Sequence, residues 1–466
     1  MKTSLIKNGK ELKQLLVSLE EVILAKIMEY ARIIFRKLLE QIDALIRQYR
    51  PRDLKVIHKR SAWYRTSLGM IWVSRRRYQD KDGKYRYLLD ELMGMDKHRH
   101  VTLGVKEIAC RLAGEMPFRK STEILSRTTP VDLSFPTIHR LVQTALADSQ
   151  EENEQALTRL EEDGALPASE GRKASLLLLE ADGVALSLQR EARSKAEVKL
   201  GIAYEGWEKV GQDRYRTVNK TCHADIVGEE RFWAGMALKL HQRYDLSDTQ
   251  YIIGGDGASW IKEGVDDWGG QYHLCRFHLN RALTRALGND KETLRAVQDH
   301  CRRGEVDSAL RLLGQAAHRA PITQAKEIRQ VSKYLKSNAD GLQDYRENLA
   351  KPDSAWRRTG AIEGNVDKLS VRRMKNQGMS WSLQGIRKML WLRISLCEDK
   401  LQECLCSPRD ENVPVTLPEK MIRRVIDRTL KYDYSDYFRA TMPALSGPHS
   451  SRPWVEMLKS LTRIAV

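Results

Sequence analysis

Four consecutive leucines, residues 176–179, place the strongest constraint on the fold of this chain. A short, wholly apolar run beside charged residues is typical of a strand that is buried on both faces of a sheet. The run leads into Glu180 and Asp182, so two carboxylates lie at the exposed end of this strand. A second apolar run, residues 251–253, leads through two glycines to Asp256. If these two strands pair, Asp182 and Asp256 lie side by side at one edge of the sheet.

Two carboxylates in this position repel one another, and burial raises the cost of ionising both. A divalent cation such as Mg²⁺ or Mn²⁺ removes the conflict, because both ions prefer oxygen ligands. Gly255 and Gly257 would also let a phosphate approach the backbone closely. Each acid has an ordinary alternative: Asp182 can belong to a turn, and Asp256 can end a loop or cap the next helix.

The surrounding segments predict an α/β domain. We expect a second strand through 198–204, a third over about 214–223, a helix from Gly228 to about Tyr244, and a short fifth strand at 271–275. A helix follows from Arg276. This order of elements is that of an RNase H-like mixed sheet, although many α/β folds share parts of it.

Composition and periodicity divide the chain into eight segments. We expect them at 1–50 (a long amphipathic helix), 51–100 (a β-hairpin region), 101–148 (a helix-turn-helix-like region), 149–172 (a linker), 173–280 (the first part of the sheet domain), 281–350 (an all-helical insertion), 351–400 (the second part of the sheet domain) and 401–466 (a C-terminal tail). The first helix either packs on its own domain or forms a dimeric coiled coil, and its heptads do not decide between the two.

The formal net charge of +17 indicates an anionic partner. Aromatic residues make up 7% of the chain, which favours contact with a DNA duplex over base-stacking RNA binding. In the helix-turn-helix-like region, Thr137 and Arg140 are expected on the outer, DNA-reading face of the last helix. Arg75 and Arg76 lie near a hairpin signal, Asp82-Gly83, as a possible phosphate-contacting edge. An ordinary helical hairpin and a solvated strand edge are the alternatives.

A third acid, Glu363, lies in a segment with helical periodicity. An apolar stripe repeats at three- and four-residue steps, and Glu363 falls at its edge, where it can reach a metal site at the end of the sheet. Lys368, Arg372 and Arg373 lie around the same helix, where they can grip a DNA strand. The alternative is a first-turn glutamate that favours the helix dipole.

Cysteine usage and hydropathy bear on the compartment. The seven cysteines are odd in number and scattered, so they form no disulfide framework, and a reducing compartment fits. The chain has no run of about 18 apolar residues, and its first residues lack a signal-peptide cleavage pattern. We therefore expect a cytoplasmic, nucleoid-associated protein without a membrane partner.

Several segments, taken together, resemble one family of mobile-element enzymes. They read ADGVALSLQREARSKAEVKLGIAYEGWEKVG, RYRTVNK, GGDGASWIK, RFHLNRAL, IEGNVDK, FRKSTEIL and TIHRLVQ. In combination they resemble the ISLre-type insertion-sequence transposases, which are similar to the wider Mutator-like DDE transposases. The resemblance covers about residues 60–395. It implies that Asp182, Asp256 and Glu363 form a catalytic triad holding two Mg²⁺ or Mn²⁺ ions, and that 281–350 is a helical insertion.

The Mutator-like pattern also contains a Cys-x-x-His motif after the fifth strand, which here is Cys275 and His278. As a zinc site it is incomplete, because no second ligand pair has metal spacing. We expect the motif to position DNA or the active-site network; a histidine satisfied within a helix start is the alternative. The relatives often have Asp at the first position, so Cys275 is a departure within the family.

We therefore predict a DDE transposase that binds the terminal inverted repeats of its own element and target DNA, and that cleaves and joins strands. A homodimer or larger synaptic complex is expected, because two element ends must be held at once. One alternative is an RNase H-like nuclease or resolvase. Another is a non-catalytic DNA-binding regulator, which predicts a lost carboxylate. A metabolic α/β enzyme is disfavoured, since the chain has neither GxGxxG nor GxxxxGK[ST].

Overall fold

The computed structural model describes residues 9–95, 100–348, 356–376, 378–406 and 415–432. The chain divides into two compact units, one built from residues 1–102 with 411–466 and the other from residues 103–410. Of the expected C-terminal segment 401–466, residues 407–414 and 433–466 lie outside the described part. Within that part, none of the helices combines the length and apolar character needed to cross a membrane.

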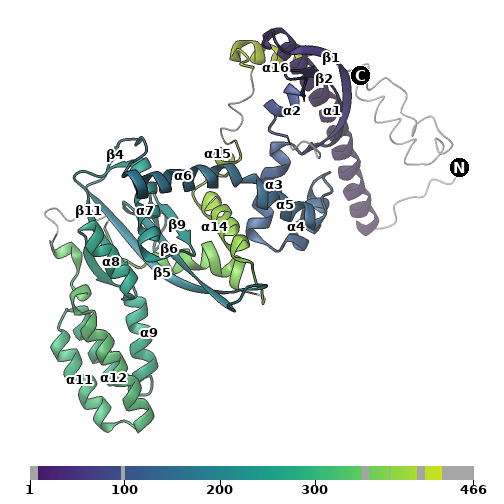
Figure 1. The fold of residues 1–466 in the computed structure, drawn as a ribbon. Helices are drawn as coiled ribbons and strands as arrows, with labels where there is room; N and C mark the ends of the chain where they lie inside the picture. The colour runs from purple at the N-terminus through teal and green to yellow at the C-terminus, as the bar shows by residue number, and fades with distance from the viewer. Residues whose placement is uncertain (1–8, 96–99, 349–355, 377, 407–414, 433–466) are drawn as a thin grey trace. The chain divides into compact units, whose positions relative to one another are not determined.

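The first unit consists of a long helix, a twisted hairpin and short helices (Figure 1). Its elements are α1 (Gly9–Tyr49), β1 (Lys55–Thr66), β2 (Gly69–Gln79), β3 (Tyr85–Arg86), α2 (Leu88–Leu92) and α16 (Glu419–Lys431). β1 and β2 pair along almost their whole length, and β3 adds to β2. The Asp82-Gly83 signal is confirmed as the turn between β2 and β3, where the Asp80 amide donates to the Lys84 carbonyl at 3.0 Å.

The two halves of α1 differ in their surroundings. In the C-terminal half, buried Leu39 and Ile46 pack in the core beneath the hairpin. In the N-terminal half, Leu16, Ile23 and Ile27 are exposed. Packing within its own unit therefore accounts for the second half of the helix, and the coiled-coil alternative remains a prediction for the first half.

The structure differs from the expectation that Arg75 and Arg76 form a basic edge at the hairpin. Arg75 is 3% exposed, and its Nε lies 2.7 Å from Oδ1 of Asp90. Arg76 forms an ion pair with Asp43, which is itself 1% exposed. Both guanidinium groups neutralise buried carboxylates inside this unit, where an unpaired charge would be costly. Arg75 is therefore buried, and Arg76 remains partly exposed.

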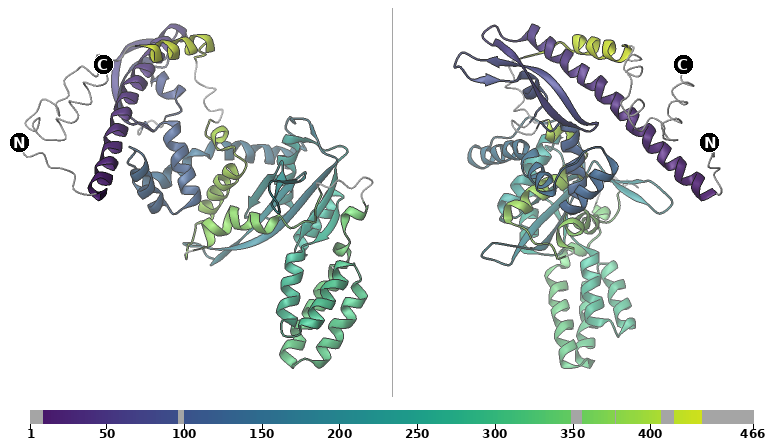
Figure 2. Two further views of the ribbon diagram at one scale, coloured as in Figure 1. Left: turned by 180° about the vertical axis from the view of Figure 1, so that it is seen from behind. Right: turned by 90° about the vertical axis from the view of Figure 1, so that its right-hand side faces the viewer.

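The second unit is built on a five-stranded mixed sheet (Figures 1 and 2). Its strands are β5 (Leu176–Ser187), β6 (Lys195–Tyr204), β9 (Thr221–Asp225), β11 (Gln250–Gly255) and β12 (Gln271–Leu274). They are ordered β12-β11-β5-β6-β9. β5, β6 and β9 run antiparallel, whereas β11 returns to pair in parallel with both β5 and β12. The leucine run is fully buried, as its sequence predicts.

Two helices cover this sheet through a shared apolar core. α7 (Glu229–Arg243) contributes Phe232 and Trp233, and α8 (Ser259–Trp268) contributes Trp260 and Ile261. These side chains pack on Leu177 and Ile253 of the central strands. Burial of large aromatic side chains is a major stabilising contribution, at about 25 cal/mol for each Å² removed from water.

Two expected segments have different bounds. The expected third strand, 214–223, is two strands: β8 (Tyr215–Val218) pairs with β7 (Gly206–Lys209) as a separate hairpin, and β9 begins after it. Asn219, at φ 52°, turns the chain between them. The expected linker 149–172 is shorter, because α6 (Ala147–Asp163) occupies its first part and ends at Gly164, at φ 64°.

Three helices precede α6, as expected. They are α3 (Leu103–Glu115), α4 (Phe118–Thr128) and α5 (Phe135–Ala145), with Ser134 at the N-cap position of α5. α5 buries Ile138, Leu141 and Val142 and exposes Arg140. These helices belong to the same compact unit as the sheet.

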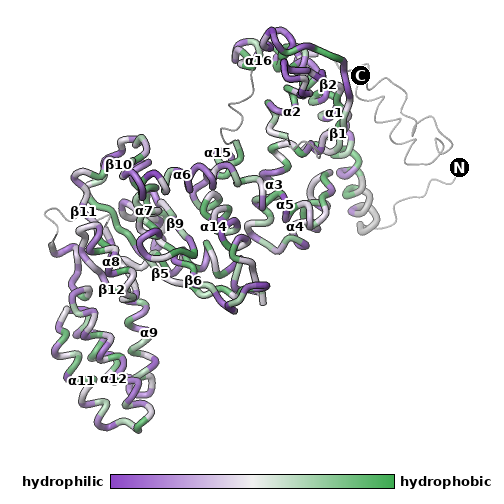
Figure 3. The backbone as a smooth tube through the Cα atoms, in the orientation of Figure 1, coloured by the Kyte–Doolittle hydropathy of each residue, from purple (hydrophilic) through white to green (hydrophobic). Residues whose placement is uncertain are grey.

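The segment after β12 is all helical, as its periodicity predicts. It comprises α9 (Arg276–Leu287), α10 (Lys291–Arg302), α11 (Val306–Arg319), α12 (Ile322–Ser337), η1 (Ala339–Leu342) and η2 (Tyr345–Asn348). The four long helices share a core that includes Leu283, Val297, Leu313 and Leu335. Figure 3 shows the colour alternating along each helix, as expected for helices that bury one face. Figures 1 and 2 show this bundle extending away from the sheet.

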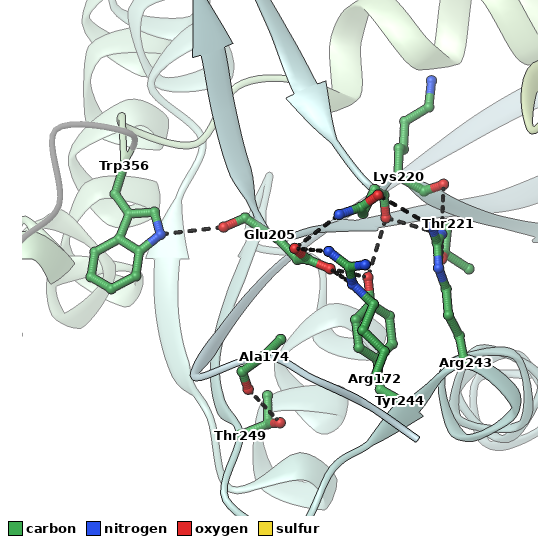
Figure 4. A network of polar contacts seen from close by, with 10 residues as sticks. Arg172, Ala174, Glu205, Lys220, Thr221, Arg243, Tyr244, Thr249 and Trp356 are labelled. Carbon is green, nitrogen blue, oxygen red and sulfur yellow. Dashed lines mark hydrogen bonds and ion pairs between the residues drawn. The ribbon is translucent and has the colours of Figure 1, made fainter. Parts of the chain in front are cut away.

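The partly buried carboxylate of Glu205 accepts hydrogen bonds from several segments at one end of the sheet (Figure 4). It accepts hydrogen bonds from Arg172 Nη2, Asn219 Nδ2 and the Tyr244 hydroxyl, each at 2.9 Å. Its backbone carbonyl accepts from Trp356 Nε1 at 3.2 Å. Burial opposes the ionisation of Glu205, but the hydrogen bonds outweigh it and lower the pKa of the carboxyl group. The ionised group therefore stabilises the fold.

Replacing Glu205 with Gln should reduce the free energy of unfolding at neutral pH by about 1–3 kcal/mol, because charge-assisted hydrogen bonds are lost. The folded-state pKa lies below the ordinary value of 4.5. The wild-type advantage should therefore be complete above about pH 4.5 and disappear as the pH falls through the folded-state pKa. Urea denaturation at a series of pH values measures this.

Glu208→Gln is the matched control, since Glu208 pairs with Arg216 on the exposed β7–β8 hairpin. That substitution should cost at most about 1 kcal/mol. An equal and pH-independent loss in both variants would contradict the role given to Glu205.

Candidate active site at the end of the sheet

Strands β5 and β11 bring Asp182 and Asp256 level with one another. In the parallel pair, Gly254 lies opposite Glu180. Two residues further along each chain are Asp256 and Asp182. The expectation that these strands are neighbours is confirmed. Asp182 is 8% exposed, and its carboxylate accepts a hydrogen bond from the Gly183 amide at 2.8 Å.

The glycines around Asp256 are required for a different reason from the one expected. A Cβ atom on Gly257, which has φ 93°, would lie 2.5 Å from Oδ1 of Asn338. A Cβ atom on Gly255 would lie 2.6 Å from Cδ1 of Ile261. Packing inside the chain and the positive φ therefore require these glycines, and close approach by a phosphate is not needed to explain them.

The buried carboxylate of Glu180 fixes the position of the third acid. Glu180 is 1% exposed and accepts hydrogen bonds from the backbone amides of residues 360, 361 and 362 at 2.9, 3.0 and 3.1 Å. The Tyr204 hydroxyl is a further donor. These amides form the N-terminus of α13 (Ile362–Val366), where a negative charge is favoured. The helix that carries Glu363 is therefore anchored on β5, beside Asp182.

Glu180 was identified in the sequence as a neighbour of Asp182 and not as an anchor. The signal was present, because a charged residue inside a buried run needs partners that compensate its lost hydration. The identity of those partners was not accessible, since they follow 180 residues later in the chain.

Three carboxylates and one imidazole interact at this place. Burial raises the pKa of Asp182, His278 and the Gly183 amide oppose this shift, and the negative charges of Glu363 and Asp256 add to it; the resulting pKa is about 6. Nδ1 of His278 lies 3.2 Å from Oε1 of Glu363. The structure thus brings together Asp182, Asp256, Glu363 and His278.

Cys275 joins the same cluster. It ends β12, and α9 begins at the next residue. Its sulfur, a ring nitrogen of His278 and a carboxylate oxygen of Glu363 all lie within 4.8 Å of one another. The Cys-x-x-His pair, which has no second ligand pair in the sequence, therefore meets its third partner through the fold.

The expected basic residues of the Glu363 helix have different positions. After Val366 the helix continues as a π-helical segment, η3 (Asp367–Lys375). Lys368 and Arg372 are exposed, and Nη2 of Arg372 lies 2.7 Å from Oδ2 of Asp367. These two residues remain accessible to a ligand.

The expected DNA contact of Arg373 is wrong. Arg373 is 2% exposed, and its Nε donates to the Ala113 carbonyl of α3 at 2.8 Å. Its guanidinium group also lies over the rings of Phe118 and Trp381. Burial lowers the pKa of this side chain to about 10. Arg373 ties the site helix to α3 and α4 and does not face solvent.

A pocket of about 430 Å³ lies beside the acids, between α9 and α12. His278, Arg281, Arg285 and Tyr334 are among its lining residues. The Tyr334 hydroxyl donates to the backbone carbonyl of Asp256 at 2.6 Å, so one wall of the pocket contacts the segment that carries Asp256. Sequence reasoning missed the two arginines, although the spacing 278, 281, 285 places them on one face of a helix.

The profile of the Uncharacterised protein family (UPF0236) matches residues 5–402, most of the chain. The chain belongs to this family. Three relatives come from Caldanaerobacter subterraneus subsp. tengcongensis, and each is named a UPF0236 protein. The first is 26% identical over 399 residues, which cover 84% of this chain and 79% of the relative. The others are 25% identical over 366 residues, covering 77% of this chain and 72% or 69% of the relative.

Replacing Glu180 with Gln should reduce the free energy of unfolding by about 2–4 kcal/mol, because the side-chain amide would face backbone donors that need an acceptor. Peptides covering residues 360–362 should also lose protection in hydrogen–deuterium exchange measured by mass spectrometry.

Tyr204→Phe is the control, since it removes one neutral donor and leaves the carboxylate with its three backbone partners. It should cost about 1 kcal/mol and leave the protection of 360–362 intact. Unchanged exchange in the Gln variant would show that Glu180 does not anchor α13.

Proposed function

We propose that this chain is a DDE-type DNA transposase, a metal-dependent enzyme that cleaves and joins DNA strands. The observation that carries the proposal is the meeting of Asp182, Asp256 and Glu363 at one end of the sheet. These acids come from the first strand, the end of the fourth strand and a helix that follows a helical insertion. The order β12-β11-β5-β6-β9, with three antiparallel strands and two parallel returns, supports an RNase H-like sheet as part of the proposal.

The donor set fits oxygen-preferring divalent ions. Asp182 is crowded by two other acids, and Oε1 of Glu363 is buried without a hydrogen-bond partner in the described part of the chain. Asp182, Asp256 and Glu363 would hold two Mg²⁺ or Mn²⁺ ions, together with DNA oxygens and water. Bound there, such ions activate the attacking oxygen and stabilise the leaving oxygen of a phosphodiester.

The remaining side chains of the site support that chemistry. Glu180 holds the N-terminus of α13, and therefore the backbone of Glu363, beside β5. Nδ1 of His278 lies 3.2 Å from Oε1 of Glu363, and this side chain opposes the rise in the pKa of Asp182. Arg281 and Arg285 line the adjoining pocket and can contact the phosphates of a strand that enters it.

Recognition of element ends is assigned to the helices before the sheet domain. α3, α4 and α5 follow the order of a helix-turn-helix region, and Arg140 on the outer face of α5 is exposed, with Thr137 partly exposed. Such a face can read the major groove of a terminal inverted repeat. Lys368 and Arg372 lie on the site helix as further contacts, and the net charge of +17 attracts DNA as a whole.

The relatives add a second kind of support. The printed name of one joins eleven gene loci, and that of another joins four, in the same organism. Multiple copies in one genome are what a self-transposing element produces. Transposition also requires two element ends to be held together, so a homodimer or larger complex is part of the proposal.

The decisive experiment follows strand cleavage and joining by the purified full-length chain on labelled DNA from both flanks of its own gene. Asp182→Asn, Asp256→Asn and Glu363→Gln should each retain DNA binding and lose at least about 10³-fold in cleavage rate. Removal of divalent ions with a chelator should abolish cleavage in the wild type, and Mg²⁺ should restore it.

Asp367→Asn is the matched control, because Asp367 is a nearby acid that pairs with Arg372 outside the cluster. It should cleave at a rate close to that of the wild type. Cleavage retained by any triad variant would remove that residue from the site. Cleavage without joining would identify a nuclease or resolvase, and binding without cleavage would identify a DNA-binding regulator.

Arg281→Ala should weaken binding of nicked or single-stranded DNA by about 1 kcal/mol and reduce the salt dependence of the affinity by roughly one phosphate contact. Arg295→Ala should change neither, since Arg295 is an exposed arginine of α10 that does not line the pocket. Fluorescence anisotropy over a range of salt concentrations measures both values. Equal slopes for wild type and Arg281→Ala would place the DNA strand elsewhere.

A further inference from the structure

Three ligand atoms of different chemistry converge at one edge of the candidate active site. They are the sulfur of Cys275, a ring nitrogen of His278 and a carboxylate oxygen of Glu363, all within 4.8 Å of one another. They come from the end of β12, the first turn of α9 and the first turn of α13. β12 is connected to β5 through β11 of the sheet, and α13 is connected to β5 through Glu180. The fold itself therefore holds the cluster in place.

The polar atoms of this cluster lack partners although they are close. Nδ1 of His278 and Oε1 of Glu363 are 3.2 Å apart and inaccessible to water, yet neither makes a hydrogen bond within the described residues. A third group bound beside these two atoms would satisfy both at once. In a tetrahedral site with bonds of about 2.0 Å, nitrogen and oxygen ligands lie about 3.3 Å apart. The observed separation matches that edge.

The sulfur of Cys275 is prepared to act as a thiolate ligand. Burial raises the pKa of the thiol to about 11, while the backbone amides of Phe277 and His278 donate to the sulfur and oppose this shift. A bound ion would replace the proton of the thiol, as thiolate ligation generally does. The amide donors remain to stabilise the thiolate once it has formed.

The donor set determines the class of metal. Mg²⁺ takes oxygen ligands, whereas a thiolate, an imidazole and one carboxylate suit Zn²⁺ and similar divalent transition metals. We propose that Cys275, His278 and Glu363 bind one such ion through three protein ligands, with a fourth position open. This site goes beyond the proposed magnesium centre and does not require it. One consequence does rest on the proposed function: the ion would compete with Mg²⁺ for Glu363.

The chain offers a matched control of the same three residue types. His300, Cys301 and Glu305 lie close in sequence at the end of α10. Nδ1 of His300 forms a hydrogen bond with Oε2 of Glu305 at 2.5 Å, so this pair is already satisfied. Cys301 packs in the apolar core of the helical insertion. This group has the residue types of a metal site, but its ligand atoms do not converge on one position.

The test uses the full-length chain and Co²⁺ as a spectroscopic probe of a Zn²⁺ site, without DNA and without a cleavage assay. The wild type should bind one Co²⁺ with a thiolate-to-cobalt charge-transfer band, and Zn²⁺ should displace it. Cys275→Ser should abolish the band. His278→Gln and Glu363→Gln should weaken Co²⁺ binding by roughly tenfold or more, since each removes a ligand. His300→Gln and Cys301→Ser should bind as the wild type does.

Absence of the band in the wild type would overturn the site, and so would equal losses in the His300 and Cys301 variants. If Cys275→Ser does not fold, as judged by circular dichroism, the His278 and Glu363 variants decide the outcome, because both side chains are partly exposed. The two proposals fail separately. If the chain shows the cobalt band but does not cleave DNA, only the transposase proposal is refuted. If the chain cleaves DNA but shows no band, only this metal site is refuted.

Discussion

The hydrogen bonds between the Glu180 carboxylate and the first amides of α13 hold the candidate site together. A charge that is 99% removed from solvent is strongly unfavourable unless donors replace its hydration. Here three backbone amides and the Tyr204 hydroxyl do so, and the amides come from a segment 180 residues later. The Glu180 carboxylate therefore gains these donors only where the chain returns to β5 after the whole helical insertion. In the sequence, the helical insertion lies between Glu180 and its three backbone partners. Glu363 comes directly after the last of these partners.

Once α13 is anchored, the crowding of the neighbouring acids follows from geometry. Asp182 lies two residues beyond Glu180 on β5, and Glu363 lies one residue beyond the last anchored amide. Neither acid receives the set of donors that Glu180 has. Asp182 keeps one amide hydrogen bond and the imidazole of His278 nearby, and its pKa rises to about 6. The chain thus satisfies one buried carboxylate fully and leaves its neighbours short of positive charge, which is the arrangement that favours cation binding.

The sequence predicts local elements and sheet neighbours well, and long-range ion pairs poorly. The runs 176–179 and 251–253 indicate buried strands because their composition allows little else, and their pairing places Asp182 beside Asp256. Periodicity likewise predicts the helical insertion. Arg75, Arg76 and Arg373 were expected on the surface because arginine usually lies there. Their burial depends on Asp90, Asp43 and the Ala113 carbonyl, which are specified by tertiary contacts and leave no trace in local pattern.

The hydrogen bonding of the carboxylates also distinguishes a binding site from a loosely packed region. Glu180 and Glu205 are two carboxylates of the second unit, and each is supplied with several donors. Among the described residues, Oε1 of Glu363 is the one carboxylate oxygen that is shielded from water and still without a hydrogen bond. Its neighbour at 3.2 Å, Nδ1 of His278, shares that condition. Native chains rarely leave two adjacent polar atoms unsatisfied, because each costs about 1–3 kcal/mol. Among the described residues, this pair joins a carboxylate oxygen and an imidazole nitrogen that both lack a hydrogen bond, and the cysteine beside it determines which ligand fits.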